Sequence, residues 1–122
     1  MHSDRIVLDG ALVLALREKR IDLDNADAFK DALLGALPQA SRALILDFSA
    51  VDYISSAGLR SLMIAHKAAK AASCNMAVAA LKPLTREIFA ISRFDVVFTL
   101  FDEVRGAVAE LAPDALDGFD AR

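Results

Sequence analysis

The sequence is poor in the residues that most often build metal centres and covalent crosslinks. Its 122 residues include one cysteine, Cys74, and two histidines, His2 and His66. A single cysteine excludes an intramolecular disulfide, and together with two distant histidines it does not make a zinc site. The aspartates lack the regular spacing of a calcium loop, and there is no glycine-rich phosphate loop. We therefore expect no metal and no cofactor, and we expect Cys74 to be a small buried thiol.

Long apolar runs and basic clusters are also missing. The longest apolar runs, such as residues 43–46 and 76–81, are far shorter than the ~20 residues that span a bilayer. The net charge of −3 provides no basic stripe for phosphates, which argues against direct nucleic-acid binding. The N-terminal residues do not read as a secretory signal. These absences favour a cytoplasmic protein without membrane insertion that acts through a protein partner.

Hydrophobic residues make up 56% of the chain, enough for one core and one domain. Asp9-Gly10 between two strand-like segments predicts a β-hairpin over residues 5–16. Further strands are predicted over residues 43–48, 75–80 and 96–99, and helices over residues 25–37, 56–72, 83–92 and 102–111. This alternation predicts an α/β domain over residues 1–112, with a mixed sheet of about five strands and about four helices mainly on one face. Residues 113–122 are predicted to form a disordered tail.

Three details of the predicted helices concern single residues. Pro38 is expected to end the first helix. In the helix over residues 83–92, the expected inward residues are Leu84, Ile88 and Ile91. In the helix over residues 56–72, an outer face is expected to carry Arg60, Ile64 and Lys67. Ile64 would be an apolar side chain facing water, which marks this face for partner contact.

Two serines lie where the strand over residues 43–48 leads into the helix over residues 56–72. Ser55 and Ser56 both stand at a helix start, where a serine side chain ordinarily caps the backbone N–H groups of the first turn. The same position is favourable for an anion, because the helix dipole and the free N–H groups point toward it. A phosphoserine there would add roughly −1.5 to −2 charges without melting the helix. One site can therefore be both a cap and a switch.

This junction resembles that of the STAS domains, a family named for sulfate transporters and anti-sigma factor antagonists, and in particular the antagonist branch. The family pattern is an apolar strand, an acidic or amide residue, a short turn and then Asp-Ser-Ser/Thr-Gly-Leu. The order of elements agrees over residues 5–112. The matching positions are Leu44-Ile45-Leu46-Asp47, Val51, Ile54 and Ser55-Ser56-Ala57-Gly58-Leu59.

The resemblance implies that Ser56 is phosphorylated by a partner kinase that is also the anti-sigma factor, and that a serine phosphatase acts on phospho-Ser56. The unmodified protein would bind the anti-sigma factor, and phosphorylation would release it. Two positions depart from the family pattern: Ser55 replaces an aspartate, and Ala57 replaces a second serine or threonine.

The resemblance also implies a partner surface beyond the serine. Antagonists carry a Gly-x-Leu-Asp turn near the phosphorylated serine, and here Glu18-Lys19-Arg20-Ile21-Asp22 keeps only its aspartate. Simple N-capping of the following helix by Asp22, Asp24 or Asn25 is the alternative for this turn. The residues expected at the partner surface are Asp22, Asp24, Asn25, Asp47, Ser55, Ala57, Gly58, Arg60, Ile64 and Lys67.

Two other functions are alternatives to the antagonist. A serine hydrolase is disfavoured because the junction lacks the leading glycine of a nucleophile elbow. Only His66 and His2 could act as the base. His66 lies ten residues after Ser56 on the same helix, about 15 Å away at ~1.5 Å per residue, and His2 lies at the N-terminus. We therefore expect no enzymatic activity. The second alternative is a STAS subunit of a lipid-transport ATPase or larger signalling complex that binds constitutively, without a phosphorylation cycle.

Overall fold

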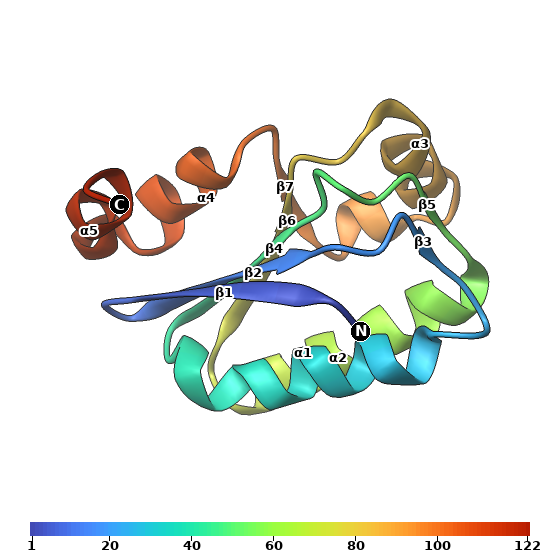
Figure 1. The fold of residues 1–122 in the computed structure, drawn as a ribbon, viewed down its shortest axis with the longest axis horizontal. Helices are drawn as coiled ribbons and strands as arrows, with labels where there is room; N and C mark the ends of the chain where they lie inside the picture. Colours follow the sequence, from blue (N-terminus) through green and yellow to red (C-terminus); the bar gives the residue numbers. More distant parts are fainter.

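A computed structural model describes all 122 residues, and its centre is a five-stranded sheet with the strand order β1-β2-β4-β6-β7 (Figure 1). β1 pairs with β2 in the antiparallel sense, and the other three pairings are parallel. The sheet is therefore mixed, as predicted. Its strands are β1 (Ser3–Leu8), β2 (Ala11–Leu16), β4 (Ala43–Asp47), β6 (Asn75–Ala79) and β7 (Thr99–Phe101).

The β1–β2 hairpin follows from its turn residues. Gly10 has a φ of +80°, a left-handed conformation that glycine adopts without steric cost. The turn sets the register that pairs Leu8 with Ala11. β2 then continues inside the sheet, and all six of its residues are buried.

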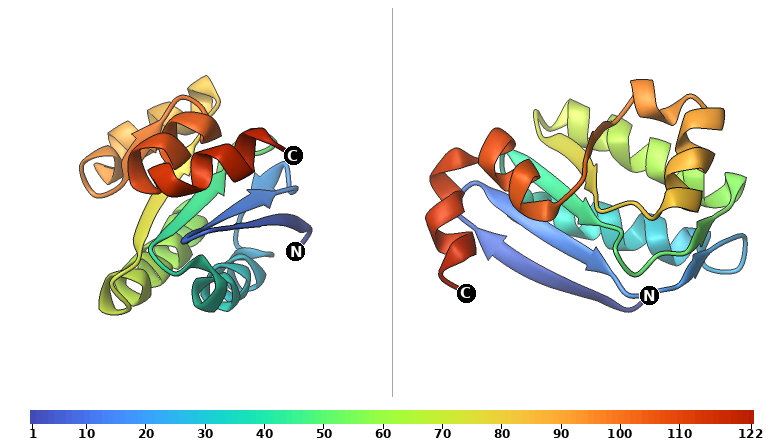
Figure 2. Two further views of the ribbon diagram at one scale, coloured as in Figure 1. Left: turned by 90° about the vertical axis from the view of Figure 1, so that its left-hand side faces the viewer. Right: turned by 90° about the horizontal axis from the view of Figure 1, so that it is seen from above.

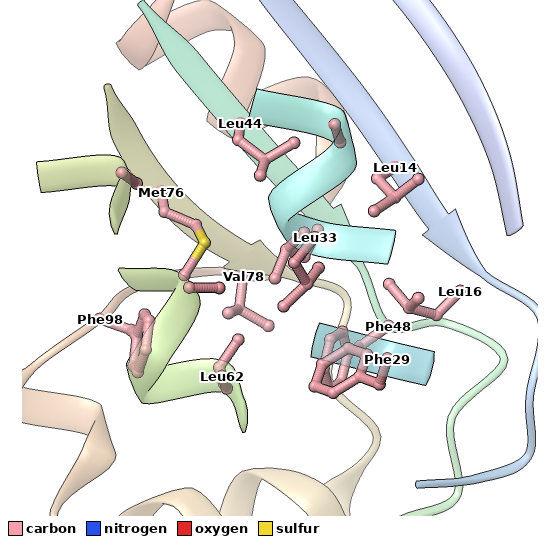
Figure 3. Packing of buried hydrophobic residues seen from close by; sticks show 14 of the residues in the cluster. Leu14, Leu16, Phe29, Leu33, Leu44, Phe48, Leu62, Met76, Val78 and Phe98 are labelled. Carbon is pink, nitrogen blue, oxygen red and sulfur yellow. The ribbon is translucent and has the colours of Figure 1, made fainter. Parts of the chain in front are cut away.

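Alternation along the central strands divides the core into two layers. On one face the large side chains of β2, β4 and β6 form the main cluster, which includes Leu14, Leu44 and Val78 (Figure 3). The opposite face carries smaller residues, among them Ala11 and Ala43. Since successive strand residues point to opposite faces, this pattern requires helices on both sides of the sheet.

The helices cover the two faces unequally. α1 (Ala26–Ala40) and α2 (Ser56–Ala71) lie side by side over the large-residue face, and α3 (Pro83–Ile91) adds Phe89 to the same cluster. α4 (Val104–Leu111) packs on the small-residue face, where α5 (Leu116–Asp120) follows it (Figures 1 and 2). No helix is both long enough and apolar enough to cross a membrane.

The first helix does not end at Pro38, as the sequence had predicted. α1 continues to Ala40, and Pro38 lies within its last turn. Proline there removes one backbone hydrogen bond near the end of the helix, a smaller loss than in the middle of a helix. Ala36 and Ala40 are both fully buried, and this packing holds the last turn in place.

The predicted inward face of α3 is wrong at two of its three residues, because only Ile88 packs against the main cluster. Leu84 and Ile91 are 55% and 76% exposed, whereas Thr85 and Phe89 are buried. Phe89 packs edge to face with Phe48, with ring centroids 6.1 Å apart. Burying this larger aromatic surface sets the rotation of the helix.

The segments on either side of β7 also differ from their predicted bounds. A 3₁₀ helix occupies Phe94–Val96, β7 itself is Thr99–Phe101, and α4 begins at Val104. Val96 is largely exposed, while Phe98 is buried in the main cluster. The chain therefore enters the sheet three residues later than predicted.

The C-terminal segment, residues 113–122, for which the sequence predicted a disordered tail, contains two short helical elements in the structure. A 3₁₀ helix, Pro113–Ala115, leads into α5. Ala112 and Ala115 are buried in the smaller core layer. Two hydrogen bonds of 3.0 Å join the Arg105 guanidinium to the Asp120 carboxylate and connect α5 to α4.

A second, two-stranded sheet was not predicted. β3 (Arg20–Ile21) pairs in parallel with β5 (Tyr53–Ile54) beyond the end of the main sheet (Figure 1). β3 directly precedes the turn that leads to α1, and β5 directly precedes α2. This short pair therefore joins the starts of the two helices.

Candidate functional site

The β3–β5 pair brings together the two segments that the sequence singled out. Ile21 is in register with Ile54, and the Ser55 N–H donates a 2.8 Å hydrogen bond to the Ile21 carbonyl. Asp22 follows Ile21 directly, and Ser56 stands two residues after Ile54. The Asp22 turn and the serine junction are therefore parts of one surface.

The two serines have different structural roles. Ser55 is the N-cap of α2, with extended backbone angles, and its hydroxyl oxygen accepts a 3.3 Å hydrogen bond from the Gly58 N–H. Ser56 is the first residue of the helix. Its side chain is exposed, and its hydroxyl makes no hydrogen bond within the protein. The capping role thus falls on Ser55 and leaves the Ser56 hydroxyl free.

Gly58 permits the close approach of α2 to the β3–β5 pair. A Cβ atom at this position would lie 2.7 Å from Ile54 Cγ1 and 2.8 Å from Ile21 Cγ2. Both isoleucines are almost completely buried, so they have little room to move away. Gly58 is itself buried and shapes the junction from inside.

The turn between β3 and α1 is held by its own side chains. The Asn25 side-chain oxygen accepts a hydrogen bond from the Asp22 N–H at 2.9 Å, and its amide nitrogen donates to the Arg20 carbonyl at 2.8 Å. The Asp22 carboxylate accepts from the Asp24 N–H at 3.1 Å. Asn25 stands at the N-cap position of α1, but its side chain makes no capping bond. Simple capping therefore does not account for this turn. Hydrogen bonds among its own residues hold it in shape, and we call residues 20–25 the braced turn.

A groove of about 140 Å³ lies between the first halves of α1 and α2. Its floor is fixed by Ser61, whose buried hydroxyl donates a 2.9 Å hydrogen bond to the Ala26 carbonyl. Two exposed apolar side chains flank it, Leu23 at 81% and Ile64 at 43% exposure. Its lining residues are Leu23, Ala26, Asp27, Lys30, Ala57, Arg60, Ser61 and Ile64.

The groove shows which predicted contact residues lie together and which do not. Ala57, Arg60 and Ile64, three of the residues expected at the partner surface, line it. Lys67 is exposed but lies farther along α2, outside the groove. Asp47 ends β4, and its carboxylate accepts the Ser49 N–H at 2.9 Å within its own turn.

Leu23 was missed by the sequence reasoning. It stands alone between Asp22 and Asp24, so it belongs to no apolar period that would draw attention to it. An isolated apolar residue in an acidic turn was the available signal. Its exposure becomes informative only beside Ile64, because the two together make an apolar border to the groove.

The charges near the junction are mixed. Lys82, the residue before α3, forms an ion pair with Asp52, and its hydrogen bond holds the pKa of that carboxyl below the usual value. The Arg20 guanidinium lies 3.9 Å from the Asp22 carboxylate and stacks over the Tyr53 ring, 4.5 Å from its centroid. Two of the acidic residues around Ser56 thus have basic neighbours of their own.

The histidine on α2 belongs to a different part of the molecule from Ser56. His66 packs against Phe98, with ring centroids 4.7 Å apart and ring planes tilted by 59°. Burial is the main cause that lowers the pKa of His66, and its Nδ1 atom is buried without a hydrogen-bond partner. Nowhere do three or more His, Cys, Asp or Glu side chains gather as a metal site would require.

These features define an α/β domain that presents an exposed serine at the start of a helix, beside a braced acidic turn and a small groove. The family model of the STAS domain matches residues 3–107. The chain therefore belongs to the STAS family, and the resemblance found in the junction residues is confirmed.

Several named relatives agree with this assignment. A Bordetella bronchiseptica protein named as a candidate anti-sigma factor antagonist, BtrV, is 31% identical over 102 residues, covering 84% of this chain and 87% of that protein. An anti-sigma factor antagonist from Mycobacterium paratuberculosis has a TM-score of 0.79 at 24% identity, covering 90% of this chain and 92% of that one. Unphosphorylated SpoIIAA, an anti-sigma factor antagonist, has a TM-score of 0.74 at 13% identity, covering 92% and 97% of the two chains. The chain is thus a relative of anti-sigma factor antagonists, and its fold is the STAS fold.

Proposed function

We propose that this protein is an anti-sigma factor antagonist that binds an anti-sigma factor with serine kinase activity and is switched off by phosphorylation of Ser56. A serine phosphatase would restore the binding form. In this proposal the chain is a binding protein without catalytic turnover. The observation that carries the proposal is the free, exposed Ser56 hydroxyl beside a neighbouring serine that already caps the helix.

The start of α2 is suited to a phosphate. The first N–H groups of an α-helix have no partner inside the helix, and the dipole places partial positive charge there. The Gly58 N–H already donates to the Ser55 hydroxyl. The N–H groups of Ser56 and Ala57, at the N-terminus of α2, remain available to a phosphate. SpoIIAA, which shares this fold at 16% identity and a TM-score of 0.64, has been solved in a phosphorylated form, so the fold accommodates the modification.

The surface around Ser56 is suited to a protein partner. Leu23 and Ile64 offer apolar contact, and Arg60 supplies a charge beside them. A hydrophobic centre with charged residues at its border is typical of interfaces between proteins. The braced turn adds Asp22, Asp24 and Asn25 as a rigid edge to the same surface.

Phosphorylation would change the charge of this surface strongly. At an assumed ~7 Å from an acidic group of the docked partner and an effective dielectric constant of about 20, each added negative charge costs roughly 2–3 kcal/mol. That is more than a tenfold loss of affinity per charge. Arg60 stands one helical turn after Ser56, within reach of a phosphate on it. A phosphate that engages Arg60 would also withdraw this side chain from the partner.

The first test is phosphorylation. The protein is incubated with ATP and ATPase-type anti-sigma factor kinases from its own genome, and its intact mass is measured. We expect one added phosphate on the wild type and on Ser55→Ala, and none on Ser56→Ala. A phosphate that persists in Ser56→Ala would overturn the assignment.

The second test is binding to the kinase that modifies the protein. We expect Ser56→Ala to bind like the unmodified wild type, and Ser56→Asp to bind at least ~10-fold more weakly. Equal affinities for the two variants would contradict the switch. If no kinase modified the chain while it remained stably bound to a lipid-transport ATPase, the constitutive subunit would replace the antagonist.

A further inference from the structure

A second cavity, of about 210 Å³, lies at the other end of α2. It is far larger than the ~10–15 Å³ that holds a single water. The cavity brings together the second half of α2, the start of β6, the approach to β7 and the end of α4. Its lining residues are His66, Lys70, Cys74, Asn75, Met76, Val97, Thr99 and Leu111.

The His66 ring presents a hydrogen-bond donor to this cavity. Its Nδ1 atom is buried without a partner, whereas Nε2 is not among the buried unpartnered atoms and makes no hydrogen bond within the protein. Buried N–H groups without a partner are rarer in proteins than acceptors without one, so we assign the proton of the neutral ring to Nε2. The ring packs at a tilt of 59° against buried Phe98, and this contact restricts its orientation.

The charge of the lining is positive. Lys70 is the only residue among the eight that carries a full charge at neutral pH, and none of them is acidic. Burial raises the pKa of the Cys74 thiol, so the thiol adds no negative charge. Asn75 and Thr99 supply further polar groups at the exposed side. The polar part of the cavity therefore combines one cation with groups that can donate hydrogen bonds, and it holds no acidic side chain.

The other half of the lining is apolar and includes Met76, Val97 and Leu111. Inorganic phosphate would leave this half without contact. A ligand with an apolar body and one anionic head would contact both halves. In small-molecule sites apolar side chains usually bury the ligand, and a few polar groups fix its orientation.

We propose that this cavity is a binding site for a small carboxylate with an apolar body, held by Lys70 and the His66 Nε2–H around the carboxylate and by Met76, Val97 and Leu111 around the body. The site is independent of the Ser56 surface, because ten residues of helix, about 15 Å, separate His66 from Ser56. It is also independent of any phosphorylation cycle.

The test uses benzoate as the probe, with benzyl alcohol and inorganic phosphate as matched comparisons. Each is titrated into the ¹⁵N-labelled protein while amide and imidazole NMR signals are recorded. We expect benzoate to shift signals of residues 66–76 and 97–99 saturably, and to shift His66 Nε2. Benzyl alcohol and phosphate should each bind more weakly, since each lacks half of the recognised chemistry.

Two substitutions test the named contacts. Lys70→Gln should weaken benzoate binding about 5-fold, as expected for an exposed charge. Lys67→Gln removes the same charge one turn earlier, outside the cavity, and should leave the affinity unchanged. His66→Phe keeps an aromatic ring packed against Phe98 and removes the donor, so it should also weaken binding. Phosphate binding as tight as benzoate, equal effects of the two lysine variants, or shifts confined to other residues would overturn the proposal.

Discussion

Replacing Gly58 with alanine tests how the serine junction is assembled. The added Cβ would lie 2.7 Å from Ile54 Cγ1 and 2.8 Å from Ile21 Cγ2, well inside van der Waals contact. Both atoms belong to stiff, β-branched side chains that are almost completely buried. Overpacking of this kind costs about 1–3 kcal/mol. Alanine is favoured over glycine inside a helix by about 1 kcal/mol, so we expect a net loss of about 0–2 kcal/mol.

Gly35→Ala is the matched control, because Gly35 lies on the exposed side of α1. A Cβ there would have only the Arg5 guanidinium as a neighbour, at 3.7 Å. This variant should gain up to about 1 kcal/mol from helix propensity alone. The free energies of unfolding of Gly58→Ala and Gly35→Ala should therefore differ by the overpacking cost, about 1–3 kcal/mol.

Urea denaturation followed by circular dichroism measures both free energies of unfolding. NMR adds a local reading, because the clash should displace β5 from β3 and shift the Ser55 amide, which donates to the Ile21 carbonyl. If Gly58→Ala were stabilised as much as Gly35→Ala and the Ser55 amide did not move, the account of a tightly packed junction would be refuted.

Three further predictions concern stability. Ser55→Ala removes the α2 cap and should lower the free energy of unfolding by about 0.5–1 kcal/mol in urea, whereas an equal loss in Ser56→Ala would contradict the assignment of the cap. His66→Phe removes an unpartnered buried nitrogen and should raise Tm. Burial lowers the pKa of His66 below 6.5, so the unfolded chain takes up the proton first and the wild type loses stability as the pH falls through that value. The Tm advantage of His66→Phe over the wild type should therefore grow from about pH 7.5 to about pH 5.5, and a constant advantage would contradict this account. Asp120→Asn breaks the pair with Arg105 and should speed amide hydrogen exchange in α5, with little effect on global unfolding; unchanged exchange would show that the pair does not hold the helix.

The parts of the fold that could be predicted are those with a local signal. Asp9-Gly10 specifies a tight turn, and the structure has the hairpin and the positive φ at Gly10. The second helix shows a clear apolar period, so its bounds and its exposed outer face agree with the structure. In both cases the residues that carry the signal are close in sequence and need no distant partner to determine their conformation.

The elements that were missed depend on distant contacts. β3 and β5 have two residues each, too few to show a period, and they exist because their backbones pair with one another. In α3 the helical spacing of Leu84 and Ile91 suggested an inward face, but the contact of Phe89 with Phe48 set the rotation. The C-terminal helix likewise depends on its contacts with α4.

The site divides in the same way between local and distant signals. The junction motif in the sequence identifies a helix start with two serines, and it cannot assign separate roles to them without the backbone geometry. In the structure the Ser55 hydroxyl accepts a hydrogen bond from the Gly58 N–H, whereas the Ser56 side chain is exposed to solvent. The groove beside it could not be predicted, because it is made by Leu23 on one side and Ile64 on the other, 41 positions apart in the sequence.

The separation of cap and candidate phosphate site on adjacent residues has a consequence for the proposed switch. If one serine did both tasks, a phosphate would replace the hydroxyl that caps the first turn, and the change of charge would be coupled to a change in how α2 begins. Here Ser55 continues to cap the helix whatever the state of Ser56, and Gly58 keeps the helix start packed on Ile21 and Ile54. A phosphate on Ser56 would therefore alter the charge presented to a partner while the surface around it keeps its shape. This predicts that release acts through electrostatic repulsion, so that it weakens as added salt screens the charges.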